Sequence, residues 1–398
     1  MALFLFLATL ALLSSLARAG ELRVVTTAHY QIHTDLDADL AGDCARRMDA
    51  MFDEYARRFA GVADLRNLPV FQVSLFRLQN DYLKLVGAQY QNTGGLFVPS
   101  RNFLAAFLEG QGRDTLRKTL QHEAFHQFVH VALPSDPPAW LNEGMAQTFE
   151  EGIWTGDEFW IGQVPPRRVR QLQADLKADR LVDFRLLATL SPEQWSDVFT
   201  GDRARAATRY NQAWATVYFL THYKDAAGVE IYRPRLLKLF QLLHDKVDDV
   251  SAFDQVFPDV ADVNKDFLAY AGSLQPTAEA TLIERQSVLA DLLIDLQLRQ
   301  GPPSDISRAR RALKRGGYRI RYSIGGLQWE SDADVTRYFS DLTGRLFTRK
   351  ELLLAPRPAA PLPDVVCRCL GRFEMRTRFH RAGDKVEHEM LIEPLGEE

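Results

Sequence analysis

The sequence predicts an α+β fold, and three stretches of the chain support that class. Near the amino end, ELRVVTTAHYQIHT at 21–34 alternates apolar and polar residues, which is typical of a β-strand. Between about 114 and 300, apolar residues recur at steps of three and four, as they do in amphipathic helices. Beyond 303 the strand-like alternation returns, in GYRIRYSIGG at 317–326 and in RFEMRTRFHRAGDKVEHEMLIEP at 372–394.

The amino-terminal part reads as a small sheet with one long helix. After the first strand, residues 35–61 have helical spacing, with apolar side chains at Leu40, Cys44, Met48, Met51 and Tyr55. A second strand is expected in LPVFQVSLFR at 68–77. A third and a fourth are expected in GGLFVPSRNFLAAFL at 94–108, with a turn at 99–102.

The middle of the chain is expected to be helical. A helix at 114–133 should stop at the proline-rich loop LPSDPP, and a second helix should begin near Trp140. Further helices are expected at 210–223, 232–244 and 277–299. RQGPPSD at 299–305 resembles a linker, so we expect a main domain at 20–300 and a smaller α/β or β-rich domain at 303–398, with a hairpin turn at 382–384.

The first twenty residues, MALFLFLATLALLSSLARAG, predict an export signal. An apolar run from 2 to 16 is followed by Ala17-Arg18-Ala19, which is typical of a signal peptide at 1–19 that is cut after Ala19. The mature protein would then be periplasmic or extracellular, without stable insertion in a membrane. No Lys or Arg precedes the apolar run, so an uncleaved amino-terminal anchor is the alternative.

Composition excludes little, but it argues against strongly charged partners. The formal net charge is −4 over 398 residues, which gives no electrostatic reason to expect binding to nucleic acid or to an anionic membrane. The three cysteines, Cys44, Cys367 and Cys369, are interpreted as structural. We expect Cys367 and Cys369 to be too close to pair comfortably with each other, and a bridge from Cys44 to either one stays open.

The stretch LQHEAFHQFVH at 120–130 carries the clearest chemical signal. On a helix, His122 and His126 lie about 40° apart on one side, opposite a stripe of apolar residues. Two imidazoles one turn apart can bind one metal ion. Glu123 lies beside them, in position to accept a proton from an activated water. An H-E-x-x-H pattern arises by chance in roughly 1% of such chains, so a third ligand is needed to support the reading.

Glu143 is the candidate third ligand. It follows His126 after about 16 residues, enough to end one helix, turn and return antiparallel to it. His122, His126 and Glu143 would form a His₂Glu site for Zn²⁺, which leaves one position for water. Gln147, one turn further on, is expected to hydrogen-bond a ligating imidazole.

At these residues the sequence resembles the gluzincin metallopeptidases of the peptidase MA clan. The match comprises H-E-A-F-H at 122–126 and W-L-N-E-G at 140–144, and it looks closest to a bacterial exported peptidase-MA-like family. The resemblance extends over roughly 21–272. It implies a thermolysin-like domain, with a small amino-terminal sheet followed by a helical subdomain. It also implies that His122, His126 and Glu143 bind zinc and that Glu123 is the catalytic carboxylate.

The resemblance suggests roles for a strand and for Tyr210, and the position of His130 on the site helix suggests a third, each with a plainer alternative. TGGLFV at 93–98 would be a strand that pairs with the substrate backbone, or else a glycine-marked turn or bulge. Tyr210 would stabilise the oxyanion, although with Ala213, Trp214 and Val217 it also forms a core-like stripe. His130 would support the site or, as we favour, act as a cation at the helix end.

The function expected from the sequence is therefore zinc-dependent hydrolysis of peptide bonds in a peptide or protein substrate, with Glu123 as general base. The alternative is a catalytically weak or inactive protein with the same fold that binds partners or acts as a scaffold in the cell envelope. A third possibility keeps zinc but changes the substrate to a non-peptide amide such as that of the cell wall.

Overall fold

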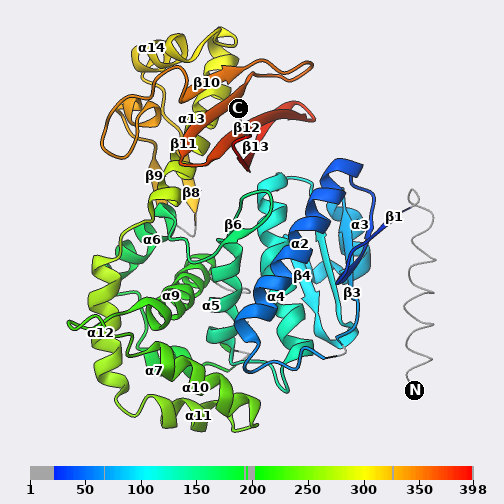
Figure 1. Ribbon diagram of the computed structural model, residues 1–398, viewed down its shortest axis with the longest axis vertical. Helices are drawn as coiled ribbons and strands as arrows, with labels where there is room; N and C mark the ends of the chain where they lie inside the picture. The colour runs from blue at the N-terminus through cyan, green and yellow to red at the C-terminus, as the bar shows by residue number, and fades with distance from the viewer. Residues whose placement is uncertain (1–21, 67, 192–193, 196–201, 325–326, 397–398) are drawn as a thin grey trace. The chain divides into compact units, whose positions relative to one another are not determined.

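The computed structural model describes residues 22–66, 68–191, 194–195, 202–324 and 327–396, and the fold is α+β as expected (Figure 1). The predicted signal at 1–19 lies outside the described residues. The chain divides into two compact units, each made of two segments. The first unit comprises the residues up to Arg58 together with Leu65–Val131. The second unit comprises Phe59–Asp64 together with Ala132–Glu398. Among the described residues, no helix is both long enough and apolar enough to cross a bilayer.

The first unit is built on a five-stranded sheet. In spatial order the strands are β1 (Arg23–Thr26), β2 (Tyr30–Thr34), β3 (Phe71–Phe76), β5 (Phe103–Phe107) and β4 (Gly95–Val98). The central strands β2, β3 and β5 are parallel, whereas β1 and β4 run antiparallel at the two edges. The four predicted strands are thus confirmed. The first predicted strand is in fact two strands, β1 and β2, which pair as a hairpin. The predicted turn at 99–102 is also confirmed, as a 3₁₀ turn that ends at Asn102 with a φ of 46°.

Helices cover both faces of this sheet. They are α2 (Ala38–Phe59), α3 (Gln79–Val86) and α4 (Arg113–Ala132), with a 3₁₀ turn at Ala88–Tyr90. On one face, aromatic rings of α2 and α4 pack together, with Tyr55 and Phe128 5.4 Å apart between ring centroids. On the other face, Tyr82 and Val86 of α3 pack against Phe76, Ala105 and Phe107. Helix α3 was not predicted, because its eight residues include too few apolar side chains for a clear period.

Two buried hydrogen-bonding side chains hold α4 in place. The Gln127 amide, which is fully buried, donates to the carbonyl oxygens of Gln72 on β3 and Asn102, both at 3.2 Å. The Tyr55 hydroxyl on α2 donates to the Gln121 carbonyl oxygen at 2.5 Å. A helix tied to the sheet on one side and to α2 on another has little freedom to rotate about its axis, so the direction of its exposed side chains is set.

The second unit is mainly helical. Its helices are α5 (Ala139–Glu150), α6 (Pro166–Lys177), α7 (Phe184–Ala188), α9 (Arg203–His222), α10 (Arg233–His244), α11 (Asp249–Val256), α12 (Val260–Ser273), α13 (Ala278–Gln300) and α14 (Ile306–Gly316). The predicted helices near 140 and at 210–223, 232–244 and 277–299 are confirmed. Helix α9 begins seven residues before the prediction, because the Asp202 carboxylate caps it by accepting the N–H groups of Ala204 and Arg205.

The carboxyl-terminal region contains the second main sheet. Its strands are β10 (Leu352–Ala355), β11 (Asp364–Leu370), β12 (Phe373–Ala382) and β13 (Lys385–Pro394), all antiparallel in that order. Two short hairpins, β6 (Ile153–Trp154) with β7 (Phe159–Trp160) and β8 (Arg321–Ile324) with β9 (Leu327–Glu330), and a 3₁₀ turn at Val335–Phe339 complete the unit. The predicted turn at 382–384 is confirmed, since Ala382 pairs with Lys385.

Helix α13 forms part of the core beneath this sheet. Its buried residues, among them Leu289, Leu292, Leu293 and Leu296, belong to the same hydrophobic cluster as Phe379 and Ile392. The core of the carboxyl-terminal region therefore begins upstream of the linker expected at 299–305. Residues 301–305 themselves are outside any helix.

The expectation for the cysteines was wrong. Cys367 and Cys369 form a disulfide with each other, and Cys44 is free and buried. Residues two apart on a strand point to the same face, and the pairing of β11 with β12 is irregular between Cys367 and Leu370. This irregularity accompanies a Cα–Cα distance of 5.5 Å, which is ordinary for a disulfide.

Candidate metal centre

The two histidines of the H-E-x-x-H pattern lie one turn apart on α4, as expected. Their ring centroids are 4.8 Å apart and their planes meet at 77°. Both side chains are half-buried, whereas Leu116, Leu120, Ala124 and Phe128 on the opposite stripe of α4 are buried in the core. The helix therefore has the apolar back and the polar front that the spacing predicts.

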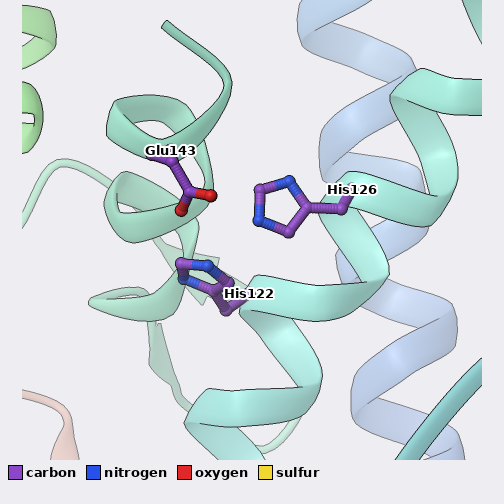
Figure 2. A group of neighbouring side chains, drawn as sticks. All are labelled: His122, His126 and Glu143. Atoms are coloured by element: carbon purple, nitrogen blue, oxygen red, sulfur yellow. The ribbon is translucent and has the colours of Figure 1, made fainter. Parts of the chain in front are cut away.

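Glu143 lies in the first turns of α5, which begins after the six residues 133–138. One ligand atom each from His122, His126 and Glu143 lie within 4.8 Å of one another. Figure 2 shows the three side chains directed toward one another from their two helices. Ligands of a tetrahedral ion at about 2.1 Å lie about 3.4 Å apart, so small side-chain rotations are enough to bring the three donors to one ion.

The donor set is suited to a divalent transition metal. Two imidazole nitrogens and one carboxylate oxygen are ligands that zinc accepts, and three protein ligands leave one coordination position open. Among the described residues, this is the group of His, Cys, Asp and Glu side chains with metal-binding geometry. The residues present therefore fit the expected ion.

Glu123 is held by a different element. Its carboxylate accepts a hydrogen bond of 2.9 Å from the backbone N–H of Phe97 on β4. The side chain is half-buried, so it has contact with solvent. Helical spacing predicted that Glu123 lies beside the histidines, but the contact with Phe97 depends on tertiary packing and could not be read from the sequence.

Gly95 allows β4 to approach α4 closely. A Cβ atom at this position would lie 2.5 Å from Cγ2 of Thr119 and 3.2 Å from the Ala105 carbonyl oxygen. Gly95 pairs regularly with Ala106 within the sheet, so it is neither a turn nor a bulge. Strand β4 is also the last strand of the sheet order, as a strand that pairs with another peptide must be.

Gly144, the residue after Glu143, has a similar role on α5. A Cβ atom there would lie 2.5 Å from the Ala213 carbonyl oxygen and 2.6 Å from Cγ2 of Val217, both on α9. The two helix backbones are therefore in direct contact at this point. The glycine of the W-L-N-E-G stretch is explained by this packing.

The expectation for Gln147 was wrong. Its amide nitrogen donates to the carbonyl oxygens of Tyr210 at 2.9 Å and Glu143 at 3.3 Å. Its side-chain oxygen accepts a hydrogen bond of 2.7 Å from Arg168. Arg168 also donates to Glu151 at 2.5 Å, and its guanidinium lies over the Trp214 ring. Gln147 thus joins α5 to α6 and α9, because it is on the buried side of its helix.

Two other candidate residues have identifiable surroundings. Tyr210 is half-buried on α9, and its ring centroid is 5.5 Å from that of Trp195. Its neighbours Ala213, Trp214 and Val217 are buried, as the core-like stripe predicts. His130 is in the last turn of α4, with its ring centroid 5.4 Å from that of Phe97. A role for Tyr210 at an oxyanion stays a prediction.

Comparison with known families gives a match to part of the chain. Residues 117–235 match the model of a family described as a protein of unknown function (DUF1570). The matched range contains His122, Glu123, His126, Glu143 and Tyr210. No curated protein matches the chain.

Proposed function

We propose that this protein is a zinc-dependent hydrolase that cleaves peptide bonds, with Glu123 as general base. The observation that carries the proposal is the convergence of three donor atoms, from His122, His126 and Glu143, within 4.8 Å. Structural zinc sites are closed by four protein ligands, usually including cysteines, whereas catalytic sites have three and keep a position for water. A His₂Glu group belongs to the second kind.

The chain's own side chains supply the rest of the chemistry. Zinc, when bound at this group, acts as a Lewis acid that polarises a carbonyl and lowers the pKa of a water toward about 7. Glu123 accepts the proton of the attacking water and delivers it to the leaving amine. The hydrogen bond from Phe97 keeps one carboxylate oxygen of Glu123 in a defined direction and leaves the other to act.

Strand β4 is the proposed contact for the substrate backbone. It is an edge strand beside the helix that carries the base, and its Phe97 N–H already donates to Glu123, which places the strand next to that carboxylate. An extended peptide added to such an edge would align its carbonyl groups along α4. Tyr210 remains the proposed oxyanion donor, and the resemblance to gluzincins supports a thermolysin-like arrangement of the whole domain.

The direct test combines metal analysis with a peptide library. The purified protein should contain about one zinc per chain, and Glu143→Ala should lose most of it because a third ligand is removed. Glu123→Gln should keep the zinc and lose hydrolysis by at least 10²-fold. Glu279→Gln, in the first turn of α13, is the matched control and should change neither. A folded protein that takes up no zinc would refute the proposal.

The library also separates the alternatives. If the protein binds zinc yet cleaves no peptide, an envelope-binding or scaffold role replaces hydrolysis, and cleavage of cell-wall amides alone identifies a non-peptide substrate.

Export is tested separately by determining the amino terminus of the secreted protein. It should begin at Gly20 if the signal is cut after Ala19.

A further inference from the structure

Helix α14 and the strand after it carry a dense group of basic residues. Between Ile306 and Ser323 there are seven basic side chains and no acidic one. They are Arg308, Arg310, Arg311, Lys314, Arg315, Arg319 and Arg321. The whole chain has a net charge of −4, so this segment departs sharply from the rest. We call it the basic segment.

The basic residues of α14 occupy one side of the helix. Ala309 and Leu313 are completely buried in the core that also contains α13 and the carboxyl-terminal sheet. At 100° per residue, the five basic side chains of α14 spread over the remaining arc. Arg308, Arg311, Lys314 and Arg315 are exposed, and Arg310 is half-buried. Packing of the apolar side therefore keeps a cationic face directed to solvent.

Nearby acidic groups neutralise only part of this charge. Arg308 pairs with Asp305, and Arg319 and Arg321 share the single carboxylate of Glu330. No ion pair is recorded for Arg311, Lys314 or Arg315 among the described residues. Arg311 and Arg315 are exposed cations available to an anionic partner, whereas Lys314 lies close enough to Asp334 to help lower the pKa of that carboxyl.

An exposed apolar side chain lies close to the basic segment. Leu298, near the end of α13, is 78% exposed, more than any other large apolar residue recorded in the described part of the chain. It lines a shallow hollow of about 880 Å³ whose charged lining is mixed, with three arginines and three acidic residues: Arg299, Arg319, Arg321, Asp291, Asp295 and Glu330. Arg299 lies over the Tyr318 ring at 4.9 Å and pairs with Asp295 at 2.9 Å, so the cations of α14 carry most of the free positive charge.

We propose that the basic segment and Leu298 form a surface that binds the anionic face of a lipid bilayer. The arginines would contact lipid phosphates, for which the guanidinium is well shaped. Leu298 would enter the boundary between headgroups and acyl chains. An exposed leucine among cations matches a bilayer surface better than it matches duplex DNA, whose phosphates would contact the cations and leave the leucine without an apolar partner.

This surface does not depend on the proposed hydrolysis. All its residues lie between Asp295 and Glu330, away in sequence from the metal-binding group. Urea unfolding followed by circular dichroism therefore checks the folding of any variant of the surface, whether or not the protein binds zinc.

The test is co-sedimentation of the full protein with vesicles. Vesicles that contain 30% phosphatidylglycerol should bind it at low salt, vesicles of phosphatidylcholine alone should not, and 0.5 M salt should release it. Each lost cation should weaken binding about fivefold, so Arg311→Gln/Lys314→Gln/Arg315→Gln should lose about 100-fold. Leu298→Ala should lose at least about fourfold, the contribution of one inserted methylene group.

Matched controls separate this surface from general charge. Lys224, Lys238 and Lys265 are exposed cations on other helices or loops, and their triple change to Gln removes the same charge. Leu237→Ala removes an exposed leucine from α10. Both controls should bind vesicles like the parent. Equal loss in the two triple variants, or binding to a 30-base-pair DNA duplex without binding to vesicles, would overturn the proposal.

Discussion

Replacement of Gly144 by Ala tests the close packing next to the metal-binding group. In the interior of a helix this change alone stabilises by about 1 kcal/mol. Here the new methyl group would lie 2.5 Å from the Ala213 carbonyl oxygen and 2.6 Å from Val217, where ordinary contacts are at least 3.4 Å. Helices α5 and α9 must then separate by close to 1 Å, and overpacking of this kind costs about 1–3 kcal/mol. We therefore expect a net loss of about 1 kcal/mol in the free energy of unfolding.

The measurement is urea unfolding followed by circular dichroism, with Gly42→Ala as control. Gly42 is inside α2, and a Cβ atom there would meet only a guanidinium nitrogen of Arg46, at 3.6 Å. That variant should be stabilised by about 0.5–1 kcal/mol. Gly144→Ala should also weaken zinc binding, because Glu143 is the adjacent residue. If both variants are stabilised equally, the reasoning about close packing is wrong.

Three further predictions concern buried polar groups. Gln286 is almost fully buried and donates to two carbonyl oxygens and a hydroxyl of β11 and β12, so Gln286→Leu should cost about 1–3 kcal/mol in urea unfolding. Burial raises the pKa of the Asp43 carboxyl, but the ion pairs with Arg47 and Arg117 outweigh it and leave this pKa below its usual value. The stabilisation from Asp43 is thus present above about pH 4 and lost as the pH falls further, so Asp43→Asn should flatten the acid decline of the urea midpoint. Burial raises the pKa of the Cys44 thiol to about 12, so native protein should not react with a thiol reagent at pH 8, whereas unfolded protein should.

The candidate metal-binding group could be predicted largely because its geometry is local. The spacing of His122 and His126 determines their common side once the segment is helical. Glu143 follows after a loop of six residues that includes Pro137 and Pro138, and such a loop leaves the next helix few directions except back along the first. Short-range constraints were sufficient to bring all three candidate ligands together.

Other features could not be predicted because they depend on the order of packed elements. Strand β4 precedes β5 in the sequence but lies outside it in the sheet, and this order brings Phe97 to Glu123. The direction of Gln147 depends on which side of α5 meets α9, which periodicity in a mostly apolar helix does not reveal. The basic segment was missed for a different reason. Only the net charge of the whole chain was considered, and acidic residues elsewhere in the chain offset the positive charge of this segment.

Gly95 and Gly144 offer a way to test zinc binding and proton transfer by Glu123 separately. Neither has a positive φ, so each is needed for close approach and not for an unusual backbone conformation. Gly95→Ala would push β4 away from Thr119 on α4 and disturb the hydrogen bond from Phe97 to Glu123. It should therefore lower hydrolysis while zinc affinity stays near that of the parent, because neither histidine is displaced. Gly144→Ala acts beside a ligand and should lower zinc affinity first. If Gly95→Ala instead lost zinc while hydrolysis per bound zinc stayed unchanged, β4 would have no part in directing the base.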